Sequence, residues 1–506
     1  YIIDPLGNPF IAQGINTIVL GDSQNHKDFS ITSYGLEEVY FERITKELKE
    51  TGINLAAVST HADLLKVPDG LPIIVSVSTN GNYMRSIGRP QVSEGVFPYN
   101  NTINVFDPDF VKSANETAVT TITEGGYAEN PFIFGYTSDN ELPSGDDILT
   151  RYLTLDPKEE PTNSFSYAVA WTWLKHRMGT ECPTLDEYYA HPELLEMNRE
   201  FLGFIYARYY RVTREAIEVL DPNHMYIGSR INGTLYTCED FHRAAGYYLD
   251  IITANLYGGL NPVGTTMTGM YRNSGIPFIV TEFFAKGIDA IDSNGYPMAN
   301  STGAGILVHT QQDRADYYEH YSLAMIESKA CVGWIWYRFR DNDQSIYTSA
   351  DGRRLIMLHM VYGVGAHPNT LMDVDTGEIL TAAQVGTLTT VYKGEGLASN
   401  QNVNKGLYNG NFSSTVVIYE YDASGKLISS TGYDVEHPDS REPEAGTVVV
   451  AKDGGGSFTI GKVVNADGSY TETVLTAYKG QYVAFANAIK NISDHMMGLI
   501  TYFDAE

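Results

Sequence analysis

Two glutamates are the residues of this sequence best placed to do chemistry. Glu141 closes the stretch Gly135–Glu141, where it follows a short apolar run and stands next to the amide side chain of Asn140. Glu282 lies within the apolar run Val280–Phe283. A carboxylate in such a run is costly to bury unless it is paired or has a function. Two of them, each at the end of a buried strand, would form a facing pair across a cleft.

A facing pair of carboxylates is what the hydrolysis of a glycosidic bond requires. One carboxyl group must be protonated so that it can deliver a proton to the leaving oxygen, and the other must be ionised so that it can attack or activate water. Proximity itself separates the two pKa values, because like charges disfavour double ionisation. The alternative is that both side chains only cap strand ends with hydrogen bonds. The presence of a pair, rather than a single glutamate, favours catalysis.

The elements that would position the two glutamates are eight short apolar runs in the first two thirds of the chain. Each run is rich in β-branched or aromatic residues and is nearly continuous rather than alternating, which is typical of strands buried on both faces. The eight runs are Phe10–Ile15, Leu55–Val58, Ile73–Val77, Phe132–Tyr136, Met225–Gly228, Ile251–Asn255, Phe278–Thr281 and Gly333–Tyr337.

Helical stretches separate these runs. The clearest are Leu36–Glu50, a helix opened by Asp107–Pro108, the long amphipathic stretch Asn198–Leu220, and Gln312–Ala330, which leads into the last run. Strands and helices in this order predict an α/β protein with a (β/α)8 barrel, whose functional residues lie at the carboxyl ends of the strands. The alternative is an open doubly wound sheet, but no glycine-rich phosphate loop follows any of the runs.

The pattern of apolar and turn residues changes after the eighth run. Turn residues separate valine- and threonine-rich runs, as in hairpins of a sandwich-like domain, and the chain then ends on apolar residues spaced three or four apart. We interpret the β-rich block as an insertion before the last barrel helix; the alternative is a separate C-terminal domain whose final helix docks elsewhere. The predicted organisation is a catalytic barrel at 1–345, an irregular connection at 346–408, a β-rich accessory domain at 409–480 and the last barrel helix at 481–506.

The motif around the two glutamates resembles a known signature. Asn140-Glu141 after the fourth run, with Glu282 after the seventh, resembles the clan A glycoside hydrolases. The resemblance implies that Glu141 is the acid/base, that Glu282 is the nucleophile and that anomeric configuration is retained. A narrower resemblance is to the β-agarase and β-porphyranase branch, which acts on red-algal galactans. It rests on the strings Tyr136–Pro143, Asp221–His224 and Asn404–Leu407.

The resemblance implies a function, and two alternative functions compete with it. It implies a secreted, endo-acting, retaining β-glycosidase that cleaves β-galactosidic linkages of porphyran or agarose by double displacement and requires no cofactor. One rival is an exo-acting clan A β-glycosidase on a plant or host glycan. The other is a non-catalytic carbohydrate-binding barrel protein, against which the retention of both glutamates argues.

Further residues have predicted roles beside the two glutamates. Asn140 is placed to bond the sugar 2-hydroxyl, a contact that strengthens in the transition state. Asn255 and Tyr257 end the sixth run, and the resemblance implies that Tyr257 hydrogen-bonds the nucleophile. Many clan members carry an arginine at the end of strand two. This chain has Val58–Asp63 there, which makes His61 a candidate for its partial replacement.

Two tryptophans lie on the eighth run. Trp334 and Trp336 are two positions apart, so their side chains point to the same face of the strand. One of them is expected to form the floor of a sugar-binding subsite, because the CH-rich faces of sugars stack on aromatic rings. Trp336 is the better candidate, since it is nearer the strand end. The alternative is that both side chains pack the barrel.

Basic residues are few, yet several follow the ends of the predicted strands. Around a catalytic mouth they would suit an anionic polymer such as a sulfated galactan, because guanidinium groups bind sulfate through paired N–H donors. The alternative is that they pair with nearby aspartates and brace loops. The residues are Arg85, Arg89, Arg230, Lys286, Arg338 and Arg340.

Composition excludes several other classes of protein. The 506 residues include 34 basic and 62 acidic ones, a net charge of −28, and so acidic a surface repels the phosphates of nucleic acid. No apolar run reaches the roughly 18 residues that a membrane span needs. No nucleic acid partner is therefore expected, and the polysaccharide substrate is what the resemblance implies.

The sequence predicts no metal site. Its 3 cysteines are too scattered for a disulfide framework or a zinc site. Asp341-Asn342-Asp343 resembles the start of a calcium loop, but Gly352 stands where an EF-hand needs glutamate. The chain opens at Tyr1 without a signal peptide, so we expect any targeting segment to lie outside it and infer a secreted, periplasmic or cell-surface location.

Overall fold

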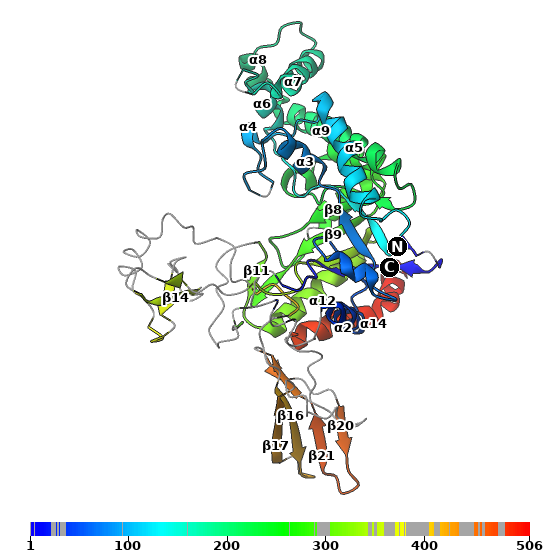
Figure 1. The fold of residues 1–506 in the computed structure, drawn as a ribbon, viewed down its shortest axis with the longest axis vertical. Helices are drawn as coiled ribbons and strands as arrows, with labels where there is room; N and C mark the ends of the chain where they lie inside the picture. Colours follow the sequence, from blue (N-terminus) through cyan, green and yellow to red (C-terminus); the bar gives the residue numbers. More distant parts are fainter. Residues whose placement is uncertain are drawn as a thin grey trace.

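The fold is built around a sheet of eight parallel strands at the centre of Figure 1, a computed structural model of the chain. The structure describes residues 2–4, 6–21, 27, 30, 37–93, 95–158, 160–262, 264–287, 289–290, 304–342, 347–348, 352–358, 370–373, 375–378, 380, 404–408, 415–424, 426–434, 450–453, 456–457, 461–473 and 481–505.

The eight strands close into a barrel. Their order in the sheet is β7-β6-β5-β4-β3-β12-β9-β8, and all neighbours are parallel. Just beyond β7, Ile231 forms a parallel bridge with Ala254 of β8, which joins the two edges. The predicted (β/α)8 barrel is therefore confirmed, and each strand overlaps one of the eight predicted runs, although β6, β9 and β12 extend one or two residues beyond theirs. The strands are β3 (Ala12–Ile15), β4 (Leu55–Ala56), β5 (Ile73–Ser76), β6 (Ile133–Thr137), β7 (Met225–Tyr226), β8 (Ile252–Asn255), β9 (Phe278–Phe283) and β12 (Cys331–Trp336).

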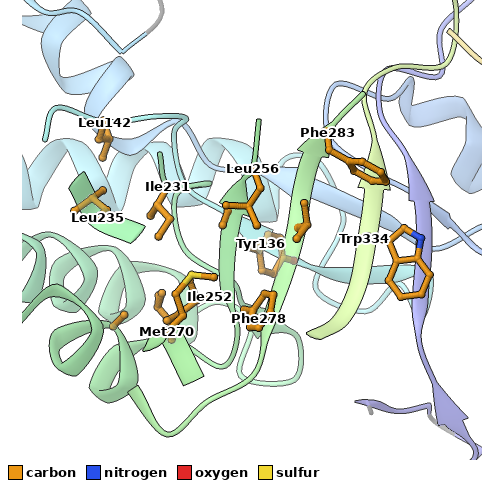
Figure 2. Close-up of a cluster of buried hydrophobic side chains, with 14 of the residues drawn as sticks. Tyr136, Leu142, Ile231, Leu235, Ile252, Leu256, Met270, Phe278, Phe283 and Trp334 are labelled. Atoms are coloured by element: carbon orange, nitrogen blue, oxygen red, sulfur yellow. The ribbon is translucent and has the colours of Figure 1, made fainter. Parts of the chain in front are cut away.

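Alternate residues of the strands enter two different cores. On β9, Phe278 and Val280 belong to a large core that also contains helix residues, whereas Ile279 belongs to a small core formed by residues in or beside the strands. Because side chains alternate between the two faces of a strand, the small core fills the barrel and the large core lies between the barrel and its helices. Figure 2 shows part of the large core, with Phe283 and Trp334.

Helices cover the outside of the barrel. Between β4 and β5, a fully described stretch, the chain forms only the 3-10 helix η1 (Ala62–Lys66) where a regular barrel has an α-helix. In the described part of the chain, no helix is both long and apolar enough to cross a membrane. The covering helices are α2 (Glu37–Thr51), α5 (Pro108–Ala118), α9 (Leu194–Glu218), α10 (Glu239–Tyr248), α11 (Gly264–Ser274), α12 (Gln311–Glu327) and α14 (Val483–Ala505).

The C-terminal helix α14 packs between α12 and α2. The side-chain amide of Gln13 on β3 donates to the carbonyl of Ile489 on α14 (2.8 Å). Gly52, with a φ of +98°, ends α2, and a Cβ at this position would lie 2.6 Å from Ser493 of α14. The absence of a side chain at Gly52 thus permits both the turn and the close approach of the two helices.

Two connections at the carboxyl ends of the strands carry extra helices, which form the upper part of Figure 1. Arg89 in the connection after β5 forms an ion pair with Glu160 in the connection after β6 (2.6 Å), which ties the two together. These insertions were not predicted from the sequence. Their helices are α3 (Thr79–Ser86) and α4 (Pro98–Asn101) after β5, and α6 (Ile148–Leu153), α7 (Asn163–Met178) and α8 (Leu185–Tyr189) after β6.

The strands between β12 and α14 form two small sheets. One has the order β13-β14-β15, and the other has the order β19-β18-β16-β21-β20 with β17 beside β16. The division of the chain at residues 345, 408 and 480 stays a prediction. The remaining described elements are β1 (Ile2–Ile3), β2 (Pro9–Phe10), η2 (Val119–Thr123), η3 (Gly233–Tyr236), β10 (Ala285–Gly287), β11 (Ile306–Val308), β13 (Tyr347–Thr348), β14 (Arg354–Leu358), β15 (Thr370–Asp373), β16 (Thr415–Tyr421), β17 (Leu427–Asp434), β18 (Val450–Asp453), β19 (Gly456–Ser457), β20 (Gly461–Val464) and β21 (Tyr470–Thr473).

Candidate active site

The loop after β6 carries Glu141 and is held by the neighbouring strand. The N–H of Ser138 donates to the carbonyl of Gly228 (2.7 Å), and the N–H of Glu141 donates to the carbonyl of Arg230 (3.2 Å). Glu141 has a φ of +48°, a left-handed conformation that is uncommon for a residue with a Cβ. Such conformations persist where the surrounding structure fixes them, and they concentrate at active sites.

Asp139 anchors the same loop to helix α3. Its carboxylate accepts hydrogen bonds from the N–H groups of Asn80 and Gly81 (2.7 and 2.8 Å) and from the hydroxyl of Tyr209 (2.6 Å). The two N–H groups belong to the first turn of α3, where they have no partner within the helix. Burial raises the pKa of Asp139, and the donors oppose this shift. No role is predicted for Asp139 from the sequence, although a carboxylate directly after a buried strand is itself a signal of pairing.

Glu282 lies on β9, and its side chain is only 10% exposed. Its Oε1 accepts from Nη1 of Arg230 and its Oε2 accepts from the hydroxyl of Tyr257, both at 2.7 Å. Burial and then the charge of Glu282 raise the pKa of Tyr257 well above its ordinary value, so the tyrosine keeps its proton and acts as a donor. Each carboxylate oxygen therefore has its own donor, which fixes the orientation of Glu282.

Asn255 connects the surroundings of the two glutamates. It is fully buried at the end of β8, and its Nδ2 donates to Oε1 of Glu141 (2.9 Å) and to Oδ1 of Asn140 (3.1 Å). Its Oδ1 accepts from the hydroxyl of Thr281, the residue before Glu282 (2.8 Å). One amide thus joins the loop after β6 to strand β9.

Tyr236 on η3 faces both glutamates. Burial, followed by the negative charges of Glu141 and Glu282, raises the pKa of this tyrosine above its ordinary value. Its hydroxyl donates to the carbonyl of Asn255, which places the tyrosine at the end of β8. Both glutamates therefore lie at one mouth of the barrel. No sequence feature beyond the general abundance of tyrosine marks Tyr236.

The two carboxylates have different surroundings. Glu282 is buried beside a guanidinium group and a phenol, whereas Glu141 is partly exposed and accepts a hydrogen bond from a neutral amide. An adjacent cation favours the ionised form of a carboxylate. A pair whose environments differ in this way can divide the roles of nucleophile and proton donor.

Trp334 and Trp336 point to the same face of β12, but that face is the helix layer. Both side chains are fully buried. The indole Nε1 of Trp334 donates to the hydroxyl of Tyr318 on α12 (3.0 Å), and the ring of Trp336 lies 4.3 Å from that of Phe485 on α14. The prediction that Trp336 floors a sugar subsite is therefore wrong, because a ring covered by two helices cannot stack on a sugar.

The guanidinium group against Glu282 comes from beyond β7 and not from the end of the second barrel strand. His61, the predicted partial replacement for the strand-two arginine, begins η1: its Nδ1 accepts the N–H of Asp63 (3.3 Å), and its ring stacks on Phe41 of α2 (4.9 Å). Arg230, just beyond β7, makes the contact with Glu282 instead. The contact with Glu282 therefore belongs to Arg230, and a substrate-binding role for His61 stays a prediction.

Contacts within the protein also involve the other predicted cations. Arg89 pairs with Glu160 and lies over the ring of Tyr99 (5.1 Å). Arg340 is buried and donates to the hydroxyl of Ser30 (2.9 Å). These contacts favour the alternative that both arginines brace loops.

The three remaining cations differ in exposure. Arg85 is exposed on α3, where it donates to Asn82. Arg338 is buried and donates to Asn342 (3.0 Å). Lys286 is buried on β10, and burial lowers its pKa. A sulfate-binding role for these three stays a prediction.

Asp341, the first residue of the sequence that resembles a calcium loop, has a structural role. The carboxylate of Asp341 accepts from the N–H groups of Lys405 and Gly406 (2.8 and 2.7 Å) and from the hydroxyl of Tyr482 (2.6 Å), and so ties β12 to the start of α14. Asp343 lies outside the described residues. Within the described ranges, no group of three or more histidine, cysteine, aspartate or glutamate side chains could hold a metal ion.

Gly95, in the connection after β5, packs against the backbone of Glu141. A Cβ at this position would lie 2.5 Å from the carbonyl oxygen of Glu141, and the φ of Gly95 is +69°. We expect Gly95→Ala to displace the carboxylate loop and to lower kcat roughly 10- to 100-fold, since small misplacements at reacting groups are costly. Steady-state kinetics on a polymeric galactan measures this loss.

Gly88 provides a matched control for that experiment. It lies in the same connection with a φ of +72°, but a Cβ there would have no atom within 4 Å. Gly88→Ala therefore carries the same kind of backbone cost, about 1 kcal/mol, without the collision. Equal kcat values for the two variants would show that Gly95 does not position Glu141.

Comparison with known proteins relates the chain to agarases in sequence. No family model matches it. Beta-agarase B of Vibrio sp. (strain JT0107) is 25% identical over 260 residues, which are 47% of this chain and 26% of that protein. Beta-agarase A of the same strain is 23% identical over 343 residues, 62% of this chain and 33% of that protein. The matches thus span between a quarter and a third of the length of these curated relatives.

Solved structures share the fold. A crystal structure of BpGH50 matches the whole chain and 81% of its own chain, with a TM-score of 0.64 and 20% identity. The structure of an exo-beta-agarase matches 67% of this chain and 57% of its own, with a TM-score of 0.52 and 18% identity. The likeness to BpGH50 extends over the regions outside the barrel as well as the barrel itself.

Proposed function

We propose that this chain is a retaining β-glycosidase that hydrolyses β-galactosidic linkages of a red-algal galactan. Glu141 is the acid/base and Glu282 is the nucleophile. The observation that carries the proposal is the pair of glutamates at one mouth of the barrel in unlike surroundings, with Asn255 bonded both to Glu141 and to Thr281, the residue before Glu282. We expect their carboxyl groups to lie roughly 5–5.5 Å apart, the spacing of a retaining mechanism.

The environments of the two glutamates support these roles. Arg230 and Tyr257 hold Glu282 in one orientation beside a positive charge, which suits an ionised nucleophile. Glu141 is partly exposed, so it can exchange its proton with water between the two steps. Asn140, held by Asn255, is the proposed donor to the sugar 2-hydroxyl.

The reaction then has two steps. In the first, an oxygen of Glu282 bonds to the anomeric carbon while the glycosidic C–O bond breaks and Glu141 protonates the departing oxygen. In the second, Glu141 takes a proton from water, the water oxygen bonds to the anomeric carbon, and the carboxylate of Glu282 leaves. Two inversions give net retention.

The similarity to beta-agarases supports agarose as the first substrate to test. Porphyran is the second substrate to test, because the exposed Arg85 and the buried Arg338 and Lys286 are candidates to bind its sulfate groups. A polymer of this size does not enter a cell unaided, so the proposal includes a secreted, periplasmic or cell-surface location. Endo action is proposed, and exo action is the alternative.

One digest tests the proposal. Agarose, porphyran and a panel of plant and host glycans are incubated with the protein, and reducing ends, product lengths and the anomeric configuration of the first products by NMR are measured. We expect reducing ends from a galactan, a ladder of intermediate lengths and β-configured products. Inverted products would exclude the double displacement, short products alone would select the exo alternative, and no release on any glycan would leave a carbohydrate-binding protein.

A further inference from the structure

Arg230 contacts both candidate catalytic glutamates from a single position. Its carbonyl accepts the N–H of Glu141 (3.2 Å), and its Nη1 donates to Oε1 of Glu282 (2.7 Å). Its own N–H donates to the hydroxyl of Thr253 on β8 (2.9 Å), and the next residue, Ile231, pairs with the same strand. The backbone of Arg230 is therefore fixed by the barrel, while its carbonyl holds the backbone of Glu141 and its guanidinium group holds the carboxylate of Glu282.

We propose that Arg230 is the positioning residue that sets the two catalytic glutamates relative to one another and holds the nucleophile as a carboxylate. The inference rests on the proposed function. Arg230 has a φ of +45° and a side chain that is 10% exposed, a combination rare for an arginine. A strained, buried residue persists when its surroundings require it, and here two of its contacts are with the candidate catalytic glutamates.

This assignment replaces the role predicted for Arg230 from the sequence, which was sulfate binding. A guanidinium group within 2.7 Å of a buried carboxylate is engaged with that carboxylate. A planar guanidinium group suits this contact because its N–H donors are fixed in direction.

The positive charge has a different effect on each step of the reaction. Glu282 is negative in the resting enzyme and neutral once it is esterified to the sugar, so an adjacent cation favours the states in which it is a free carboxylate. Arg230 therefore speeds the departure of Glu282 from the glycosyl-enzyme. Other groups facing Glu282 include the phenols of Tyr257 and Tyr236, which keep their protons, and the carboxyl group of Glu141.

Arg230→Met and Arg230→Lys test the inference on neutral agarose. In Arg230→Met, we expect the acidic limb of the pH profile of kcat/KM to move upward by about one unit or more, because the lost cation no longer favours the ionised nucleophile. The glycosyl-enzyme should accumulate, so kcat and KM fall together. Arg230→Lys should keep the acidic limb within about half a unit but lose roughly 10-fold in kcat, since a point charge orients Glu282 less well.

Arg177→Met is the matched control. Arg177 makes a comparable 2.6 Å ion pair with Glu200, on the helices after β6, and its loss should leave the pH profile unchanged. An unshifted acidic limb in Arg230→Met, or a loss confined to porphyran, would overturn the inference. Should Arg230→Met fail to fold, wild-type kcat in Arg230→Lys would overturn it.

A mechanism-based label separates this inference from the proposed function. A 2-deoxy-2-fluoro galactoside with a good leaving group traps the covalent intermediate, and peptide mass spectrometry identifies the labelled residue. A label on a residue other than Glu282 contradicts the proposed function itself. A label on Glu282 together with an unshifted acidic limb in Arg230→Met contradicts only the role of Arg230.

Discussion

Replacing Glu282 by glutamine is expected to abolish hydrolysis, with kcat/KM falling at least about 10⁴-fold on every substrate. The substitution removes the nucleophile of the covalent step while keeping the shape of the side chain, and the loss of a nucleophile is among the largest single-residue effects in enzymes. A good leaving group does not help, because no glycosyl-enzyme forms without the carboxylate. Initial rates on a polymeric galactan and on an aryl β-galactoside measure the loss.

Loss of folding has to be separated from loss of chemistry in this variant. Glu282→Gln removes the carboxylate that pairs with the buried charge of Arg230, so we expect a lower melting temperature as well. Calorimetric binding of a galactan oligosaccharide shows whether the folded site persists. Glu116→Gln, at an exposed position on α5, is the control and should match the wild type. Residual hydrolysis above about 1% in a folded Glu282→Gln would assign the nucleophile elsewhere.

The barrel and the place of the two glutamates could be predicted because both follow from local sequence. Strand β9 is buried along its whole length, so the run from Phe278 to Phe283 reads as continuous apolar sequence interrupted by one carboxylate. In a parallel barrel, strand ends of one polarity meet at one mouth. A glutamate after the fourth strand and another on the seventh must then lie at the same end of the molecule.

The orientation of a strand's faces could not be predicted in the same way. Because side chains alternate along a strand, Trp334 and Trp336 must lie on one face, but the alternation does not say which face points into the barrel. The structure puts Val332 and Ile335 of β12 in the inner core and both tryptophans in the outer one. Side-chain volume gives a reason, since the interior of an eight-stranded barrel is narrow and is usually filled by branched aliphatic residues.

Pairings between distant residues were also hidden in the sequence. Arg230 meets Glu282 across 52 positions of the chain, and Asn255 meets Glu141 across 114. Nothing local distinguishes Arg230 from the other arginines that follow strand ends, so charge alone suggested a common role for them all. The positive φ of Arg230 and the path of the chain beyond β7 direct its side chain toward Glu282, and neither is visible in the sequence.

Replacing Glu141 by alanine is expected to lower kcat/KM on polymer by a factor on the order of 10²–10⁴, the usual worth of a general acid/base. The loss should be smaller on an aryl β-galactoside with a good leaving group, because that group departs without protonation. The basic limb of the pH profile should also disappear, since the group whose deprotonation causes it is gone. Kinetics on both substrates across pH measure these effects.

Azide provides the sharpest test of the role of Glu141. In Glu141→Ala no base activates water, so the glycosyl-enzyme formed from an aryl galactoside should accumulate. Azide needs no such base: its nitrogen bonds to the anomeric carbon, the carboxylate of Glu282 leaves, and a β-galactosyl azide is released. Turnover should therefore rise with azide in Glu141→Ala but not in Glu282→Gln, where no ester forms. Near-wild-type hydrolysis of polymer by Glu141→Ala, or an α-configured azide product, would contradict the assignment, because a retaining acid/base variant must lose the first and can form only the β-product.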